Sequence, residues 1–458
     1  MLDLYGSRLD RTCCGLSRRE MLRVGTLGLG GLTLPWLLQA RATAGSASRN
    51  KSVVLLFCSG GPSHIETFDP KPTAPDDVRS LTGHIETSLP GVHFGGTFGR
   101  LAQHAHRMAI VRSFAHKTGD HVKAIEQVFQ CGNPAKAGMG AIVSRLRGSS
   151  HPDTGMPTHV HLFADEVDGQ YSNEKGRMLN ADGAGSLGAA FTPFYPGGRG
   201  DVNRNMQLGI SVDRLDERRA LKESLDRLER DVDTRGQMAG LDKFEQQAFE
   251  LILGKSRDAF DLSREDPELV RRYDTSSFQT GHKKYRRSEL GKQLLLARRL
   301  CEAGCGFVTI QNPGWDMHAD GNNPGIKKGM EMLGTPVDQA VSVFLEDIAA
   351  RGLDSEILLI ITGDFGRTPK LNKNGGRDHW PGLSTLALAG GGGLKMGQVI
   401  GRSSPRLDAP ATPPIGLENL LATVLHALFD VGQLRLSTNI PRDIATVLER
   451  ADPIAGLV

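Results

Sequence analysis

The chain has 458 residues, of which 39% are hydrophobic, 23% charged and 5% aromatic, and it contains 56 glycines and 23 prolines. This composition excludes a coiled coil, a collagen-like repeat and a disordered tail protein. Six arginines and three acidic residues among the first 44 positions account for the whole formal net charge of +3. The remainder is formally neutral, so no electrostatic argument points to nucleic-acid binding.

The amino terminus has the pattern of an export signal. Arg18 and Arg19 precede an uncharged stretch at residues 24–38 that is too short to span a bilayer, and Ala-Thr-Ala at residues 42–44 is a small-x-small cleavage site. Paired arginines before a weakly hydrophobic, glycine-rich stretch resemble a twin-arginine signal, although a basic start to a buried helix is an alternative. We therefore predict a cleaved signal at residues 1–44, export by the twin-arginine translocase, and a periplasmic or extracellular mature chain without a transmembrane segment.

The body of the chain alternates predicted strands and helices. Residues 53–57 form a continuous apolar run of the kind that a central parallel strand needs when both of its faces are buried. In chain order we then predict a helix from residue 288 that ends at Gly304, a strand at 307–310, a helix at 337–350, strands at 357–361 and 385–388, and a helix at 417–429. This alternation predicts an α/β domain at residues 45–458, with a mostly parallel central sheet and helices on both faces. Ligands of such sheets bind beyond the carboxyl ends of the strands.

One stretch departs from this alternation. Residues 213–273 are charged, nearly free of glycine and periodic in leucine, and we interpret them as part of a helical insertion at about 213–285. The four cysteines outside the signal are too few for a disulfide scaffold. Cys301 and Cys305 lie four residues apart, where one disulfide or two buried thiols would both be compatible with the spacing.

Candidate metal ligands follow the predicted strands. Asp316 and His318 come after the strand at 307–310, and with one residue between them both side chains can point the same way and bind one ion. Asp364 follows the next strand, and His379 lies some fifteen residues further on. Carboxylate oxygens and imidazole nitrogens are ligands that zinc, manganese and iron accept. A lone aspartate at a strand end more often caps a helix or turn, but here all the candidates are predicted at one edge of one sheet.

Three further residues are candidates for chemistry or binding. Thr118 lies in a segment dense in histidine and could be an activated hydroxyl nucleophile, or it could cap a helix before Val122. Arg367 and Arg377 could hold a phosphate or sulfate group through forked hydrogen bonds, or could simply pair with acids.

Five motifs in order carry a family resemblance, at residues 57–71, 112–113, 315–318, 362–369 and 376–380. Together they closely resemble the exported bacterial proteins called domain of unknown function 1501, over nearly the whole mature chain. The resemblance implies an alkaline phosphatase-like and sulfatase-like α/β core that binds one or two divalent ions, such as zinc, manganese or calcium. It also implies that Asp316 and His318 form the first metal pair, that Asp364 is the aspartate of the usual Thr-Gly-Asp-His-Gly element, and that His379 is the late histidine ligand.

The sequence also departs from that superfamily. Phe365 stands where the superfamily usually has a histidine, and Ser59 stands about where the first strand is usually followed by an aspartate, with His64 or Asp69 as substitutes. We also count His64 among the residues that could bind substrate. The formylglycine signature of sulfatases is missing, because neither Cys58 nor Cys131 starts a Cys-x-Pro-x-Arg run.

These observations lead to a functional expectation. We expect an exported, metal-dependent hydrolase of phosphate or sulfate esters, small-molecule or polysaccharide, in which Asp316, His318, Asp364 and His379 hold the metal. Thr118 or a water activated by the metal would be the nucleophile. The alternative is a secreted binding or structural protein that kept the fold and lost its activity.

Overall fold

The computed structural model describes residues 48–165, 167–196, 214 and 255–458. The predicted signal at 1–44 and most of the predicted insertion, with its periodic leucines, lie outside the described residues. The chain divides into two units, one of residues 50–428 and 441–458 and one of residues 1–49 and 429–440. The described part of the second unit contains α14 (Val431–Leu436), which begins where Asp430 accepts a hydrogen bond from the N–H of Gln433.

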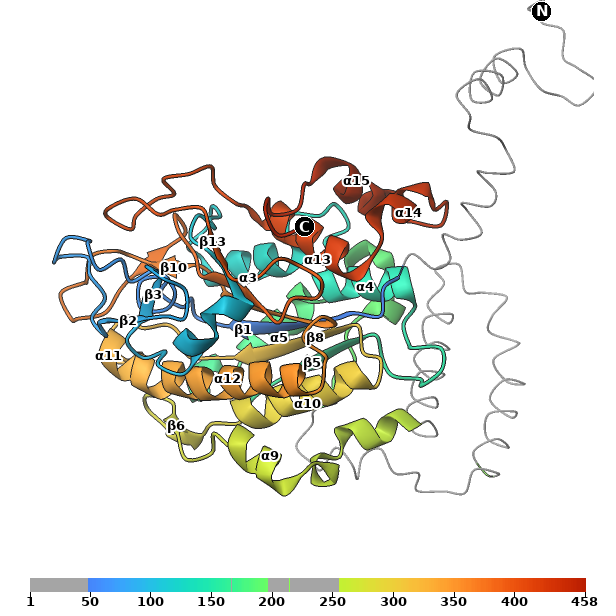
Figure 1. The fold of residues 1–458 in the computed structure, drawn as a ribbon, viewed down its shortest axis with the longest axis horizontal. Helices are drawn as coiled ribbons and strands as arrows, with labels where there is room; N and C mark the ends of the chain where they lie inside the picture. Colours follow the sequence, from blue (N-terminus) through green and yellow to red (C-terminus); the bar gives the residue numbers. More distant parts are fainter. Residues whose placement is uncertain (1–47, 166, 197–213, 215–254) are drawn as a thin grey trace, which may run out of the picture. The chain divides into compact units, whose positions relative to one another are not determined.

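A seven-stranded sheet forms the centre of the larger unit (Figure 1). Its strands lie in the order β13 (Gln398–Ile400), β4 (Met108–Val111), β12 (Leu386–Ala389), β9 (Ile357–Gly363), β1 (Ser52–Cys58), β8 (Phe307–Asn312) and β5 (His159–Leu162). Strand β12 is antiparallel to both of its neighbours, and the other pairs are parallel. The expected mostly parallel sheet is therefore confirmed.

Three adjacent strands end at the same level. Cys58, the last residue of β1, is paired with Asn312 of β8 on one side and with Gly363 of β9 on the other. All three strands are buried along their whole length, as their continuous apolar runs predicted. Because they are parallel, the loops that follow them begin side by side at one edge of the sheet. This register brings together chain segments about 250 and 300 residues apart.

Helices cover both faces of the sheet (Figure 1). On one side lie α10 (Leu290–Glu302) and α12 (Thr335–Ala350), which are the helices predicted from residue 288 and at 337–350. On the other side lie α3 (His121–Gln130), α4 (Met139–Arg147) and α13 (Leu417–Leu428), with α5 (Glu174–Ala181) packed against α3. The core contains alternate residues of the central strands and the inner faces of these helices. Each fully buried aliphatic side chain contributes roughly 1.5–3 kcal/mol to stability.

Shorter elements complete the described chain. The two-stranded ribbons are β2 (His84–Glu86) with β3 (His93–Gly95), β6 (Gln279–Thr280) with β7 (Arg286–Arg287), and β10 (Gly366–Arg367) with β11 (His379–Trp380). The remaining helices are α9 (Pro267–Tyr273), α11 (Ile326–Gly329), which continues through the π-helix η8 (Met330–Gly334), and α15 (Arg442–Arg450). Turns of 3₁₀ helix lie at η2 (Leu101–Arg107), η3 (Gly169–Tyr171), η4 (Gly185–Leu187), η5 (Ala189–Phe191), η6 (Lys255–Phe260) and η7 (Leu262–Arg264).

The described end of the predicted insertion is joined to α10 and α12 by buried charges. Arg298 of α10 is completely buried and forms ion pairs with Glu265, which follows η7, and with Asp347 of α12. Tyr273 of α9 donates a hydrogen bond to the same aspartate. The four described cysteines are buried free thiols, so Cys301 and Cys305 do not form a disulfide. No helix among the described residues is long and apolar enough to cross a membrane.

Candidate metal centre

The loops after β1 and β8 are packed backbone against backbone. Gly60 has φ +109°, and a Cβ atom added there would lie 2.6 Å from the amide nitrogen of Asp316. Only glycine allows this approach, which brings Asp316 directly against the β1 loop. The N–H of Trp315 also donates to the carbonyl of Ser59 at 3.0 Å. The predicted edge of the sheet is therefore a compact platform for side chains.

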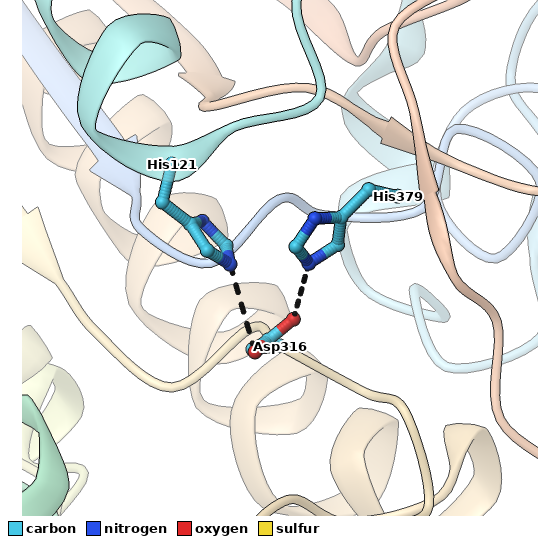
Figure 2. Close-up of side chains that lie close together, drawn as sticks. All are labelled: His121, Asp316 and His379. Carbon is cyan, nitrogen blue, oxygen red and sulfur yellow. Dashed lines mark hydrogen bonds and ion pairs between the residues drawn. The ribbon is translucent and has the colours of Figure 1, made fainter.

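Three imidazoles meet the carboxylate of Asp316 on this platform. His318 Nε2 lies 2.9 Å and His379 Nε2 lies 3.2 Å from Asp316 Oδ1, and His121 Nε2 lies 3.6 Å from Oδ2. Figure 2 shows His121 and His379 pointing at the two oxygens of Asp316 from opposite sides. His121, Asp316 and His379 together offer three ligand atoms that all lie within 4.8 Å of one another.

Each of these imidazoles comes from a different element. His121 is the first residue of α3, which Asp120 caps by accepting from the N–H of Lys123. His379 lies in β11, where it is paired with Arg367 of β10. His318 follows Asp316 by two residues in the β8 loop, as the sequence predicted. The side chains of His121, His318 and His379 are 27%, 20% and 28% exposed, so solvent reaches the cluster.

The second nitrogen of every imidazole is held by an acceptor. His121 Nδ1 lies 2.6 Å from Asp364 Oδ2, His318 Nδ1 lies 2.9 Å from Asp378 Oδ1, and His379 Nδ1 lies 2.7 Å from the carbonyl of Gly119. A carboxylate or carbonyl has no proton to donate, so in each case Nδ1 carries the hydrogen. In the neutral imidazoles Nε2 is then a lone pair directed at Asp316. Histidine ligands of metal ions are usually oriented in this way.

Two imidazole nitrogens and one carboxylate oxygen lie close enough to repel one another. The Nε2 atoms of His318 and His379 lie only 2.9 Å apart, and both adjoin Asp316 Oδ1. Two lone pairs and a carboxylate oxygen repel one another at this separation, and the guanidinium of Arg367, protons on the imidazoles or a bound cation would each offset this repulsion. Nitrogen and oxygen donors in this number are what zinc and other divalent transition metals accept. The residues present therefore fit a divalent ion.

The pKa shifts of Asp316 and His121 show how strongly the groups of the cluster interact. Burial alone would raise the pKa of Asp316, but hydrogen bonds from His121, His318 and His379 and the charge of Arg367 hold that pKa well below its usual range. Burial likewise disfavours a charged His121, yet Asp316 and Asp364 raise its pKa to about 10. Without a metal the cluster thus retains protons, and a metal ion would displace them.

Asp364 lies behind His121. Besides the bond from His121 Nδ1, its two oxygens accept from the N–H of Gly60, each at 3.2 Å, and the residue is 1% exposed. Asp364 therefore contacts the cluster through the imidazole of His121. The sequence placed Asp364 at the correct edge but as a direct ligand. The imidazole that the structure brings to the cluster instead is His121.

Arg367 is completely buried beside the cluster, where its guanidinium contacts several acceptors. Its Nη2 lies 2.5 Å from Asp316 Oδ1 and also contacts the carbonyl of Gly60, while Nε donates to the carbonyl of Gly61 at 2.9 Å. The Nη1 atom donates to the carbonyl of Arg377 at 3.1 Å. All three nitrogens of the guanidinium therefore have protein acceptors. Arg367 therefore pairs with an acid, which was the alternative to holding a phosphate or sulfate group of the substrate.

Arg377 and His64 lie away from the cluster in a second buried group. Arg377 donates from Nε and Nη2 to Glu66 Oε1, and both of these side chains are completely buried. His64 is 5% exposed and its Nε2 adjoins the carbonyl of Leu407 at 3.0 Å. Burial lowers the pKa of His64 to about 4. The structure thus does not bring either predicted substrate-binding residue to Asp316.

Thr118 precedes His121 by three positions in the sequence. The next residue, Gly119, supplies the carbonyl that holds His379. The Thr118 hydroxyl accepts a hydrogen bond from the N–H of Asp120 at 3.2 Å, one residue before α3 begins. The side chain that caps α3 is that of Asp120, so Thr118 is not the predicted helix cap.

Phe365 fills the position where the resemblance leads one to expect a histidine. Its ring is completely buried, with its centroid 4.9 Å from the ring of His121 and 4.4 Å from the ring of His379. An apolar ring there limits how the two imidazoles can turn, and it supplies no ligand for a second ion. A second metal position would therefore lack a donor at this residue.

A carboxylate from α5 also reaches this edge. Glu174 Oε2 accepts from Ser59 Oγ at 2.8 Å and from Gln311 Nε2 at 3.1 Å. Burial and the nearby charge of Asp364 raise the pKa of Glu174 to about 7. Ser59 stands where an aspartate was expected, so a carboxylate from another element lies beside that position. The sequence offered no signal for Glu174, whereas His121 was visible only as one of many histidines in its segment.

The comparisons with known proteins give a family and distant structural similarities. Residues 50–439 match the family described as "Protein of unknown function (DUF1501)". No curated protein matches the chain. The lipoteichoic acid synthase LtaP from Listeria monocytogenes is similar at 10% identity with a TM-score of 0.38, over 86% of this chain and 76% of that chain.

Two further solved structures have comparable scores. Ps i-CgsB is similar at 11% identity with a TM-score of 0.36, over 88% of this chain and 77% of that chain. The PsFucS1 sulfatase from Pseudoalteromonas sp. is similar at 11% identity with a TM-score of 0.32, over 85% of this chain and 70% of that chain. Similarity at this level does not establish a shared activity.

Proposed function

Because the chain belongs to the family described as protein of unknown function DUF1501, whose motifs resemble those of alkaline phosphatases and sulfatases, we propose that it is a metal-dependent hydrolase of phosphate or sulfate esters. Residues 1–44 lie outside the described part of the chain, and for them we propose export through the twin-arginine translocase to the periplasm or beyond. The substrate would be a small-molecule or polysaccharide ester.

The observation that carries the proposal is the arrangement around Asp316. Three imidazoles direct Nε2 at one carboxylate, and each has its Nδ1 fixed by an acceptor. His121, His318, His379 and Asp316 would hold one divalent ion. Three nitrogen donors favour zinc or manganese over calcium, which prefers oxygen ligands. A second ion has less support, because Phe365 offers no donor.

The residues of the chain would have distinct tasks in hydrolysis. A divalent ion held by these residues would supply Lewis acidity toward an ester oxygen. Asp364, Asp378 and the Gly119 carbonyl keep the three imidazoles in one orientation. Thr118, next to Gly119, remains the candidate nucleophile from this chain. Arg367 fixes the β1 and β8 loops against each other and holds Asp316 in place.

A second candidate function is a binding protein without catalysis. The observation in its favour is that Arg367 already places a positive charge 2.5 Å from Asp316 Oδ1, and that Phe365 replaces a donor. Such a protein would keep the fold and the histidines around Asp316 but would not hydrolyse esters.

Metal analysis of the full-length protein tests the proposal. We expect about one zinc or manganese per chain by mass spectrometry of the purified protein, with the ion lost in Asp316→Asn and His379→Ala. His84→Ala is the matched control, because His84 is exposed and outside the cluster. A chain that binds no divalent ion after incubation with zinc or manganese would refute the metal centre. Metal binding without turnover of aryl phosphates and aryl sulfates would favour the binding protein.

A further inference from the structure

A cavity of about 370 Å³ lies at the same edge of the sheet as the metal cluster, but beside β5 and β8. Its wall includes Asp165, shortly after β5 ends, and Asn312 and Pro313 at the end of β8. The first turn of α10, the ribbon of β6 and β7, and Leu333 of η8 also line it. None of the cluster residues lines it. The volume falls in the range of small-molecule sites, about 300–1,000 Å³.

The wall of this cavity is polar. Of the fifteen described residues that line it, ten carry a polar or charged side chain. Three are basic, namely Arg286, Arg287 and Lys292, and two are acidic, namely Asp165 and Glu289. Such a wall excludes a lipid or other apolar ligand, because apolar surface would have to replace water on these groups.

The two described acidic residues of the wall, Asp165 and Glu289, already have protein partners. Asp165 Oδ2 accepts from Arg286 Nη1 at 3.0 Å. Glu289 Oε2 accepts from the N–H of Asp165 at 3.3 Å. Each carboxylate therefore has a hydrogen-bond donor within the wall. A ligand would meet the basic groups, and it would meet them at the amino-terminal end of the thirteen-residue helix α10, where the helix dipole favours negative charge.

Within the described part of the chain, two hydrogen-bond donors of the wall have no acceptor. Gln293 is 8% exposed, and its buried Nε2 has no hydrogen-bond partner among the described residues. The buried Nε of Arg286 likewise has none, although Nη1 of the same side chain is paired. Leaving such a donor without a partner costs about 1–3 kcal/mol. A ligand with acceptor oxygens would recover this free energy.

We propose that this cavity is a second ligand site, for a molecule of about monosaccharide size that carries an oxyanion group. The polar wall fits the hydroxyl groups of such a molecule. The oxyanion would accept from Gln293 and Arg286, and Arg287 and Lys292 add positive charge at the rim. The site is separate from the metal cluster and does not depend on the proposed hydrolase activity.

Calorimetric titration of the full-length protein tests this site with four probes: glucose 6-sulfate, glucuronate, inorganic sulfate and glucose. We expect glucose 6-sulfate or glucuronate to bind at least about tenfold more tightly than glucose, which corresponds to about 1.4 kcal/mol. Which of the two binds better separates a sulfate-bearing from a carboxylate-bearing ligand. Equal affinity for glucose, or no binding of any probe at millimolar concentration, would overturn the proposal.

Three variants place the binding in the cavity. Gln293→Leu removes the buried donor at similar volume, and we expect it to weaken binding of the better sugar acid about fivefold or more. Arg287→Ala changes an exposed side chain, so folding is preserved, and a loss of about threefold is expected. Asp316→Asn should leave the affinity unchanged. Unchanged affinity in both cavity variants, or loss of binding in Asp316→Asn, would refute the assignment.

Discussion

His121 Nδ1 lies 2.6 Å from Asp364 Oδ2, and this contact turns the other nitrogen of the imidazole toward Asp316. A residue that the sequence suggests as a ligand therefore orients the imidazole that the sequence did not select. Asp364 therefore acts by orienting His121, whereas His121 and Asp316 face the candidate metal position directly.

Asp364→Asn should weaken metal binding without abolishing it. An amide keeps the shape but lacks the charge that fixes the His121 tautomer, so we expect about a 10- to 100-fold loss of metal affinity. Asp316→Asn should abolish binding under the same conditions. Titration of the metal-free protein with zinc against a competing chelator measures both. If Asp364→Asn also abolishes binding, Asp364 is a direct ligand, as the sequence suggested.

Arg367→Met should destabilise the fold strongly. The substitution leaves the buried carbonyls of Gly60 and Gly61 without a donor and Asp316 without its partner, and breaking a buried pair in this way costs about 3–5 kcal/mol. Urea unfolding measures the change. Arg406→Met is the matched control, because its ion pair with Asp77 is exposed to solvent and contributes little to stability. A stable Arg367→Met protein that has lost only ester turnover would instead support the substrate-binding role.

Glu174→Gln should change how stability depends on pH. The pKa of Glu174 is raised from 4.5 to about 7 in the folded protein, so between these values the folded state binds more protons than the unfolded state. Its contribution to stability is therefore present below about pH 4.5 and is lost as the pH rises through 7. Glutamine does not titrate, so the variant should gain stability relative to wild type between pH 5 and pH 8, on the order of 2–3 kcal/mol.

Urea unfolding of the metal-free proteins at the two pH values gives this difference. Comparing the change between pH 5 and pH 8 removes the effect of altered hydrogen bonds to Ser59 and Gln311, which is common to both conditions. A stability difference that is the same at pH 5 and pH 8 would contradict the raised pKa.

Gly60→Ala should weaken metal binding, because Gly60 is packed directly against the backbone of Asp316. A Cβ atom at Gly60 would lie 2.6 Å from the Asp316 amide nitrogen at a φ of +109°, so the β8 loop must move. We expect lower metal affinity and a lower melting temperature. Gly176→Ala is the control, because nothing lies within 4 Å of a Cβ there and alanine favours helix α5. Normal metal content in Gly60→Ala would show that Asp316 does not depend on this contact.

The paired arginines at the amino terminus give a prediction about export. Replacing both Arg18 and Arg19 with lysine should leave the full-length precursor in the cytoplasm, because the twin-arginine translocase reads the pair itself and not only its charge. Cell fractionation with mass spectrometry of the amino terminus measures the outcome. Export of the lysine variant, or an unprocessed amino terminus in the exported wild type, would refute the predicted signal.

Much of the fold could be predicted because buried parallel strands have a local signature. The apolar runs at residues 53–57, 307–310 and 357–361 became β1, β8 and β9, and the helices between them were found at the expected places. The strands β4, β5 and β13 were missed, since each has only three or four residues and too short a run to stand out. The strand predicted at 385–388 formed as β12, but antiparallel to β9, a direction that its residues do not encode locally.

The candidate site could be predicted where its residues follow adjacent parallel strands. Asp316, His318 and His379 were expected together and lie together. The roles of Arg377 and His64 could not be predicted, because their partners are distant in the chain. Arg377 pairs with Glu66, which precedes it by 311 positions, and the histidine meets the carbonyl of Leu407. A polar residue near a strand end has the same local sequence whether it faces solvent or a buried partner.

The sequence by itself determined that the apolar runs of β1, β8 and β9 form buried strands, that polar loops follow their carboxyl ends, and that these loops contain aspartate and histidine. Only the tertiary structure decided that the first residue of α3 supplies an imidazole, that Asp364 acts through it, and that Arg367 serves the fold. The physical reason is that backbone periodicity is set by neighbours in the chain. The partner of a side chain is set by which distant segments the packing of the sheet and helices brings within hydrogen-bonding distance.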